Sequence, residues 1–144
     1  MNKLAYVAAM IAGMLTLSAS AAAENVLYLN CKCTAVYNSS FPSRSPECGL
    51  YHIPDFTAIV DFSTGTIDLK SSDQFLKGLS GPAAISPGTI SARWDNIPAN
   101  QSARKVDLAI DRTSGEYTLG WDFGETKIRW SGICRKGDPL PTQF

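Results

Sequence analysis

Residues Val106 to Trp121 read VDLAIDRTSGEYTLGW and contain both halves of a β-hairpin. Apolar and polar side chains alternate on each side of the central Asp111–Gly115 segment, so the apolar ones share one face of an extended strand. Asp111 can accept hydrogen bonds from backbone N–H groups two residues on, and Gly115 can adopt the positive φ that closes a short turn. The stretch therefore predicts two antiparallel strands joined by a tight turn.

The same turn pattern occurs earlier in the chain. Residues 59–69, IVDFSTGTIDL, align without gaps on residues 109–119, AIDRTSGEYTL, and both contain an aspartate, two hydroxyl residues and a glycine. We expect a second hairpin there, with Asp61 and Gly65 in the roles of Asp111 and Gly115. An acid-protease Asp-Ser/Thr-Gly signature is the alternative, but a tight turn explains every residue of the pattern without catalysis.

Alternation with a period of two recurs through the chain after residue 23, whereas no stretch keeps a helical period over three turns. The sequence therefore predicts an all-β fold, either a single antiparallel sandwich or a small barrel-like sheet. Residues 34–56 and 70–88, which are rich in proline, serine and glycine, are expected to be irregular connections. The expected inward faces are formed by Leu27, Leu29, Cys31 and Cys33; by Ala58, Val60 and Phe62; by Ile90, Ala92 and Trp94; by Val106, Leu108 and Ile110; by Tyr117, Leu119 and Trp121; and by Ile128, Trp130, Gly132 and Cys134.

The first 23 residues have the organisation of a cleavable export signal of bacterial type. Lys3 precedes an apolar stretch over residues 4–17, and small residues follow up to Ala23. We expect cleavage between Ala23 and Glu24. A membrane anchor is the alternative, but the apolar stretch is shorter than the roughly 20 residues that a spanning helix needs. The expected organisation is a signal peptide (1–23), a single β domain (24–135) and a flexible C-terminal tail (136–144). The expected product is periplasmic or secreted and has no membrane anchor.

Four cysteines follow the expected signal: Cys31, Cys33, Cys48 and Cys134. An even number in a small exported domain indicates two disulfides. Direct closure of Cys31 with Cys33 is the poorest arrangement, because residues two apart in an extended strand lie about 6.5–7 Å from each other. We expect Cys134 to bond either Cys31 or Cys33, tying the last strand to the first, and Cys48 to bond the other one.

No catalytic, cofactor or metal constellation is recognisable. His52 is the single histidine, and no nucleophile elbow stands beside it. A metal site made of His52 with Cys31, Cys33 and Cys48 is the alternative, but the two-residue spacing of structural zinc sites is absent and disulfides compete for the thiols. Without Lys3, twelve basic side chains stand against thirteen acidic ones, a balance that favours neither nucleic acid nor an anionic membrane. We expect a non-enzymatic protein without a cofactor.

Large aromatic side chains recur on the expected inward faces. An eight-stranded barrel is just wide enough to be filled by side chains or to hold one small ligand. Two interpretations therefore stay open, plain packing of a small core and a ligand cavity. The candidate cavity residues are Phe62, Trp94, Tyr117, Trp121 and Trp130.

The Asp111-Arg112-Thr113-Ser114-Gly115 segment, followed by Gly132-Ile133-Cys134, resembles the ending of small exported bacterial proteins of unassigned function. The resemblance implies a small β fold and no activity. Our leading hypothesis is an exported, non-enzymatic protein that binds a small apolar ligand or a protein partner in the cell envelope through a loop-rich end. One alternative is a small secreted hydrolase or metal-binding protein that uses His52 and the cysteines. Another is a structural accessory protein whose sheet edge pairs with a partner chain.

Overall fold

The computed structural model describes residues 25–45, 48, 55–72, 76, 78–95, 97, 103 and 105–138, without the side chains of residues 41–45. The expected signal peptide, its cleavage site between Ala23 and Glu24, and His52 lie outside these described residues. Within them, no helix has the length and apolar character needed to cross a membrane.

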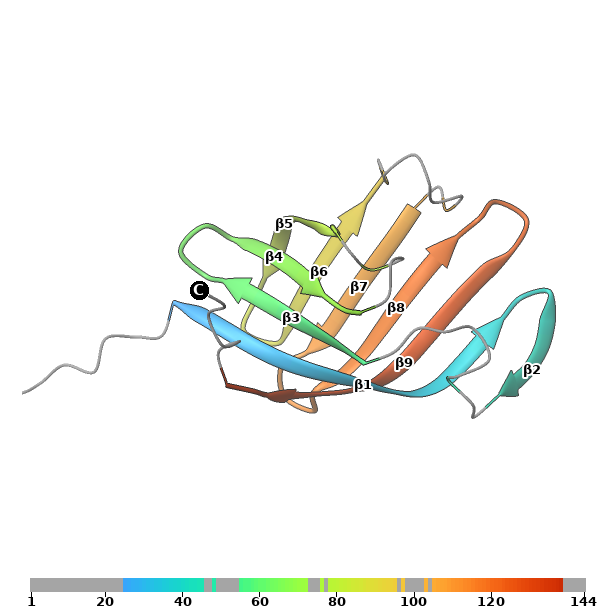
Figure 1. The fold of residues 1–144 in the computed structure, drawn as a ribbon, viewed down its shortest axis with the longest axis horizontal. Coiled ribbons are helices and arrows are strands. Elements are labelled where there is room, and N and C mark those ends of the chain that lie inside the picture. Colours follow the sequence, from blue (N-terminus) through green and yellow to red (C-terminus); the bar gives the residue numbers. More distant parts are fainter. Residues whose placement is uncertain are drawn as a thin grey trace, which may run out of the picture.

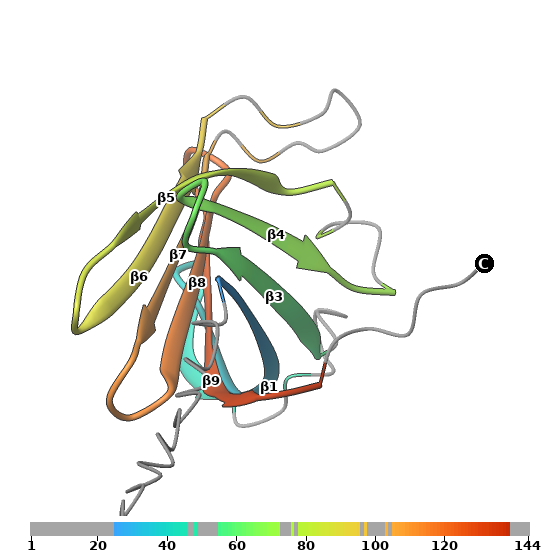
Figure 2. The same cartoon turned by 90° about the vertical axis from the view of Figure 1, so that its left-hand side faces the viewer.

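Within the described residues, one antiparallel sheet contains nine strands: β1 (Val26–Asn38), β2 (Phe41–Ser45), β3 (Phe56–Asp61), β4 (Thr66–Lys70), β5 (Ser80–Ile85), β6 (Thr89–Trp94), β7 (Lys105–Asp111), β8 (Glu116–Asp122) and β9 (Lys127–Lys136). Strands β3 to β9 are neighbours in chain order, and β1 pairs with both β3 and β9. The sheet therefore closes into an eight-stranded antiparallel barrel, while β2 extends β1 outside the ring (Figure 1 and Figure 2). The all-β prediction is confirmed, with a barrel and not a sandwich.

The long strand β1 closes the barrel because it pairs on both of its edges. Residues 26–31 pair with β3, and residues 29–38 pair with β9 on the other side. A β-bulge lies between Cys33 and Ala35, with Thr34 as the extra residue. The bulge shifts the buried positions from Leu29 and Cys31 before it to Val36 beyond it. The expectation that residues 34–56 are irregular is therefore wrong for β1 beyond Cys33 and for β2.

The expectation that residues 70–88 form an irregular connection is wrong for β5, which lies within this range. It pairs with β4 through Ser80 to Pro82 and with β6 through Ala83 to Ile85. The Ala83 N–H donates to Gly65 O on the β4 side at 2.8 Å, so the nitrogen of Pro82 faces β6. Because proline has no N–H, β5 and β6 separate there.

The barrel interior is packed with the inward side chains of every strand in the ring. Tyr117 lies edge-on to Phe56 with ring centroids 5.1 Å apart, and Trp121 lies edge-on to Trp130 at 6.0 Å. Gly132 faces the ring of Tyr117 across the β8–β9 pair. The aromatic rings therefore pack against one another as the core of the barrel.

Two disulfides join all four cysteines. Cys31 bonds Cys134, which stands directly opposite it in the β1–β9 pair with the two Cα atoms 3.9 Å apart. Cys33 bonds Cys48 with the Cα atoms 6.0 Å apart. The expected link between the first and last strands is confirmed, and Cys31 is the partner that the sequence left open. Two disulfides are consistent with an oxidising compartment.

The expected C-terminal tail begins as part of the barrel. Lys136 is the last residue of β9, and the N–H of Gly137 donates to Tyr28 O on β1 at 2.8 Å. Residues 139–144 of the tail lie outside the described residues.

Candidate functional site

Three turns meet at one end of the barrel, which we call the mouth. They are residues 62–65 between β3 and β4, residues 86–88 between β5 and β6, and residues 112–115 between β7 and β8. Antiparallel order brings every second turn to the same end of the barrel. Figure 1 shows them at the end where β1 begins and β9 finishes.

Two of these turns are closed by aspartates in the predicted way. Asp61 Oδ1 accepts hydrogen bonds from the N–H groups of Ser63 at 2.8 Å and Thr64 at 3.2 Å. Gly65 takes a φ of 64°. The Ser63 hydroxyl also donates to Asp61. This hydrogen bond contributes most to lowering the pKa of the Asp61 carboxyl, and the hydrogen bond from the Thr64 N–H contributes next.

The β7–β8 turn repeats this arrangement. Asp111 Oδ1 accepts from the N–H groups of Thr113 at 2.7 Å and Ser114 at 2.9 Å, and Gly115 takes a φ of 77°. The Ser114 N–H, followed by the Thr113 N–H, lowers the pKa of the Asp111 carboxyl. Both predicted hairpins are confirmed, and each carboxylate serves its own turn.

A cavity of about 360 Å³ opens at the mouth. Its lining combines apolar side chains that point into the barrel with the polar Asp111–Gly115 turn, so the cavity has an apolar floor and a polar rim. The floor residues are Leu27 and Leu29 from β1, Ile90 from β6, Ile110 from β7 and Cys134 from β9, and Lys136 stands on the rim.

Arg112 connects the three turns of the mouth. Its Nη1 donates to Ser86 O at 2.7 Å, and its backbone N–H donates to Gly88 O at 2.9 Å. Its guanidinium carbon lies 5.4 Å from the centroid of the Phe62 ring, within cation–π range. A guanidinium has five N–H donors, so hydrogen-bonding capacity remains beyond the Ser86 contact.

The structure places one of the five candidate cavity residues at the mouth and the other four in the buried core. Phe62 is half-buried at the mouth beneath Arg112. The other four, Trp94, Tyr117, Trp121 and Trp130, are buried inside the barrel. Trp121 also borders a groove on the outer wall, formed by β7, β8, β9 and the end of β1.

Three polar atoms of the aromatic core have no hydrogen-bond partner among the described residues. They are Trp94 Nε1, Trp130 Nε1 and the hydroxyl of Tyr117. Burial, with a smaller contribution from the Asp55 carboxylate, raises the pKa of the Tyr117 hydroxyl far above its usual value. The Tyr117 hydroxyl therefore stays protonated, and the ring packs in the core.

Sequence reasoning placed the floor residues of the mouth on inward strand faces but did not bring them together as a site. It also treated Arg112 as a turn residue. A usable clue was the alignment of residues 59–69 on 109–119, because Phe62 and Arg112 occupy equivalent positions in it. The structure shows these two equivalent side chains in contact across the mouth.

A metal or thiol-based site has no support in the described residues. All four cysteines are oxidised, so none offers a thiolate. Among the described Cys, Asp and Glu residues, no three side chains group as metal ligands. Comparison of the chain with protein-family models, with curated proteins and with solved structures found no match.

Proposed function

We propose that this protein is an exported, non-enzymatic binding protein that takes a small, largely apolar ligand at the mouth of its barrel. The observation that carries this proposal is the cavity of about 360 Å³, which joins an apolar floor to a polar rim. Pockets for small ligands have volumes of about 300–1,000 Å³ and combine apolar walls with a few polar groups. The mouths of β-barrels are among their usual places.

The packing of the interior supports a ligand site at the mouth and not at the centre of the barrel. Edge-on ring pairs between Phe56 and Tyr117 and between Trp121 and Trp130 belong to the buried core of the barrel. An eight-stranded barrel leaves little space once such side chains fill it. The ligand therefore lies above this core, against Leu27, Ile90 and Ile110.

The charges at the rim define the polar end of the ligand. The Asp111 carboxylate is engaged by the N–H groups of its own turn. Arg112 keeps unused donors beside the cavity, and Lys136 adds a second positive charge to the lining. A ligand with an apolar body and an anionic head fits this arrangement, since charge-assisted hydrogen bonds are stronger than neutral ones.

Anilinonaphthalene sulfonate, an apolar ring system with one anionic group, is a direct probe of the proposed site. Titration of the purified protein should give a saturable rise in probe fluorescence with one probe per chain. Ser114→Trp introduces a large ring at the rim of the cavity, and we expect it to weaken binding by about tenfold because it occupies the ligand's volume.

Thr64→Trp is the matched control, because Thr64 aligns with Ser114 in the other turn and is not part of the cavity lining. It should leave the affinity for the probe unchanged. Equal loss of binding in both variants, or no saturable binding to the unaltered protein, would refute the proposed function.

A further inference from the structure

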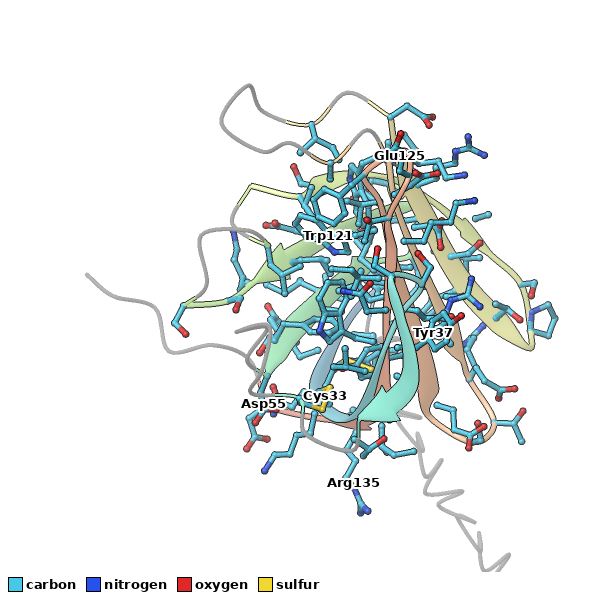
Figure 3. The ribbon with its side chains drawn as sticks, turned by 90° about the vertical axis from the view of Figure 1, so that its right-hand side faces the viewer. Cys33, Tyr37, Asp55, Trp121, Glu125 and Arg135 are labelled. Carbon is cyan, nitrogen blue, oxygen red and sulfur yellow. A yellow bond between two sulfur atoms is a disulfide. The ribbon has the colours of Figure 1, made fainter. Side chains whose placement is uncertain are left out.

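A groove of about 530 Å³ lies on the outer wall of the barrel, apart from the mouth. The strand registers place Asp107 on β7, Gly120 on β8, Arg129 on β9 and Tyr37 on β1 side by side in one row across the wall. Figure 3 shows Tyr37 on the outer side of this wall and Trp121 on its inner side. The groove therefore belongs to a different surface from the ligand cavity at the mouth.

Gly120 forms the floor of the groove because it has no side chain. A Cβ at this position would lie 2.8 Å from Oδ2 of Asp107, so the Asp107 carboxylate leans over Gly120. Neighbouring strands are about 4.8 Å apart, which puts the backbones at Asp107 and Arg129 about 10 Å from each other. The missing side chain thus leaves room for the Asp107 carboxylate above Gly120, with Arg129 on the next strand.

The charged side chains of the groove are of both signs and are not paired with each other. Lys105, Asp122 and Lys127 form the adjacent row next to Asp107 and Arg129. Within the described residues, the ion pairs are Lys70–Asp68 and Arg93–Asp95, neither of which lies in this groove. The groove therefore offers two carboxylates as acceptors and three cationic side chains as donors.

We propose that this groove binds a neutral saccharide. A carboxylate or phosphate ligand would meet Asp107 and Asp122, a cationic ligand would meet the three basic side chains, and an apolar ligand would strip water from all five charges. A hydroxyl group both donates and accepts, so it can bond a carboxylate and a cationic donor at the same time. A ligand with several hydroxyl groups satisfies both signs together.

Tyr37 supplies the apolar contact that a sugar ring requires. Its side chain is 43% exposed, and it is the one large hydrophobic residue among the described residues that is exposed to this degree. The flat ring can pack against the C–H face of a sugar while the sugar hydroxyls reach the charged row.

A second shallow groove meets the first at Asp107 and continues over β5, β6 and β7. It has a volume of about 600 Å³, and the small side chains of Ala84, Ser91 and Ala109 keep it open. The two grooves together run across several strands. This length favours an oligosaccharide over a single sugar.

The test is isothermal titration of the intact protein with neutral tetrasaccharides of glucose and of N-acetylglucosamine. We expect one of them to bind, and Tyr37→Ala to weaken its binding by about tenfold through loss of the stacking surface. Tyr28→Ala is the matched control, because Tyr28 lies on the same outer face of β1 but outside the groove. It should leave the affinity unchanged.

A second variant, Gly120→Val, should abolish binding because its side chain fills the floor and displaces the Asp107 carboxylate. The variant at the mouth, Ser114→Trp, should keep full saccharide binding, which separates this site from the proposed function. Absence of binding to both tetrasaccharides, preference for an anionic polysaccharide, or equal effects of Tyr37→Ala and Tyr28→Ala would overturn the proposal.

Discussion

Gly132 lets the β1–β9 strand pair and the aromatic core pack closely at the same point. A Cβ at this position would overlap the carbonyl oxygen of Lys32 on β1 and lie 2.7 Å from Cε1 of Tyr117. Backbone and ring therefore both occupy the space that a larger residue would need. Since Tyr117 is buried, its ring has little room to move away.

Gly132→Ala should therefore lower the free energy of unfolding by about 3 kcal/mol, at the upper end for overpacking, because a backbone atom blocks the new methyl group. Gly88→Ala is the control: open space surrounds Gly88, and its φ is not in the left-handed region. That substitution should change stability by less than about 0.5 kcal/mol. Urea unfolding of both variants with intact disulfides measures the difference. Equal unfolding midpoints for the two variants would contradict the close contact of Gly132 with Lys32 and Tyr117.

At the scale of elements, the two Asp-closed turns make barrel stability depend on pH. In the folded chain the pKa values of Asp61 and Asp111 lie below their ordinary value of 3.8, because turn hydroxyl and N–H groups bond the charged carboxylates. A lowered pKa stabilises the fold above the unfolded pKa, and this contribution is lost as the pH falls through the folded pKa.

We expect the free energy of unfolding to fall as the pH drops below about 4, the ordinary pKa of an aspartate. Replacing both aspartates, as Asp61→Asn with Asp111→Asn, should reduce this fall, because asparagine keeps an acceptor oxygen but does not titrate. Chemical unfolding at several pH values measures how the free energy of unfolding changes with pH in the unaltered protein and in the double variant. If the double variant loses stability as steeply as the unaltered protein, the turn carboxylates do not carry the acid sensitivity.

The elements that the sequence revealed are those with an uninterrupted period of two. Most inward strand faces and both Asp-to-Gly turns followed from that alternation and from local turn chemistry. β5 was missed because Gly81, Pro82, Ala83 and Ala84 carry almost no apolar contrast, and Pro82 argues locally against a strand. The sequence predicted β1 only as far as Cys33, because the bulge at Thr34 changes which residues face inward.

The candidate sites were harder to predict, because each depends on residues from separate strands. Leu27, Ile90 and Ile110 look like ordinary core positions until barrel closure brings them to one mouth. Gly120 likewise marks a groove only once Asp107 and Arg129 are known to flank it. The register between distant strands decides these neighbours, and a single sequence does not encode it in any local pattern.

For the whole molecule, the decisive contact is the seam between β1 and β9. Apart from β1–β3, the other strand pairs within the ring join consecutive strands. This seam instead joins the first strand of the ring to the last one. Bringing distant segments together costs more loop-closure entropy than pairing neighbours. The Cys31–Cys134 disulfide, with a sequence separation of 103, lies directly on this seam.

The two disulfides should therefore differ in their contribution to stability. In the chain-entropy model a closed loop of about 100 residues is worth about 4.7 kcal/mol, and one of about 15 residues about 3 kcal/mol. Cys31→Ser with Cys134→Ser should thus destabilise the barrel more than Cys33→Ser with Cys48→Ser, whose separation is 15. Replacing both partners in each pair leaves no free thiol from the broken bond, and urea unfolding measures both double variants against the unaltered protein. The reverse order of stabilities would mean that the Cys33–Cys48 bond contributes more to stability than closure of the β1–β9 seam does.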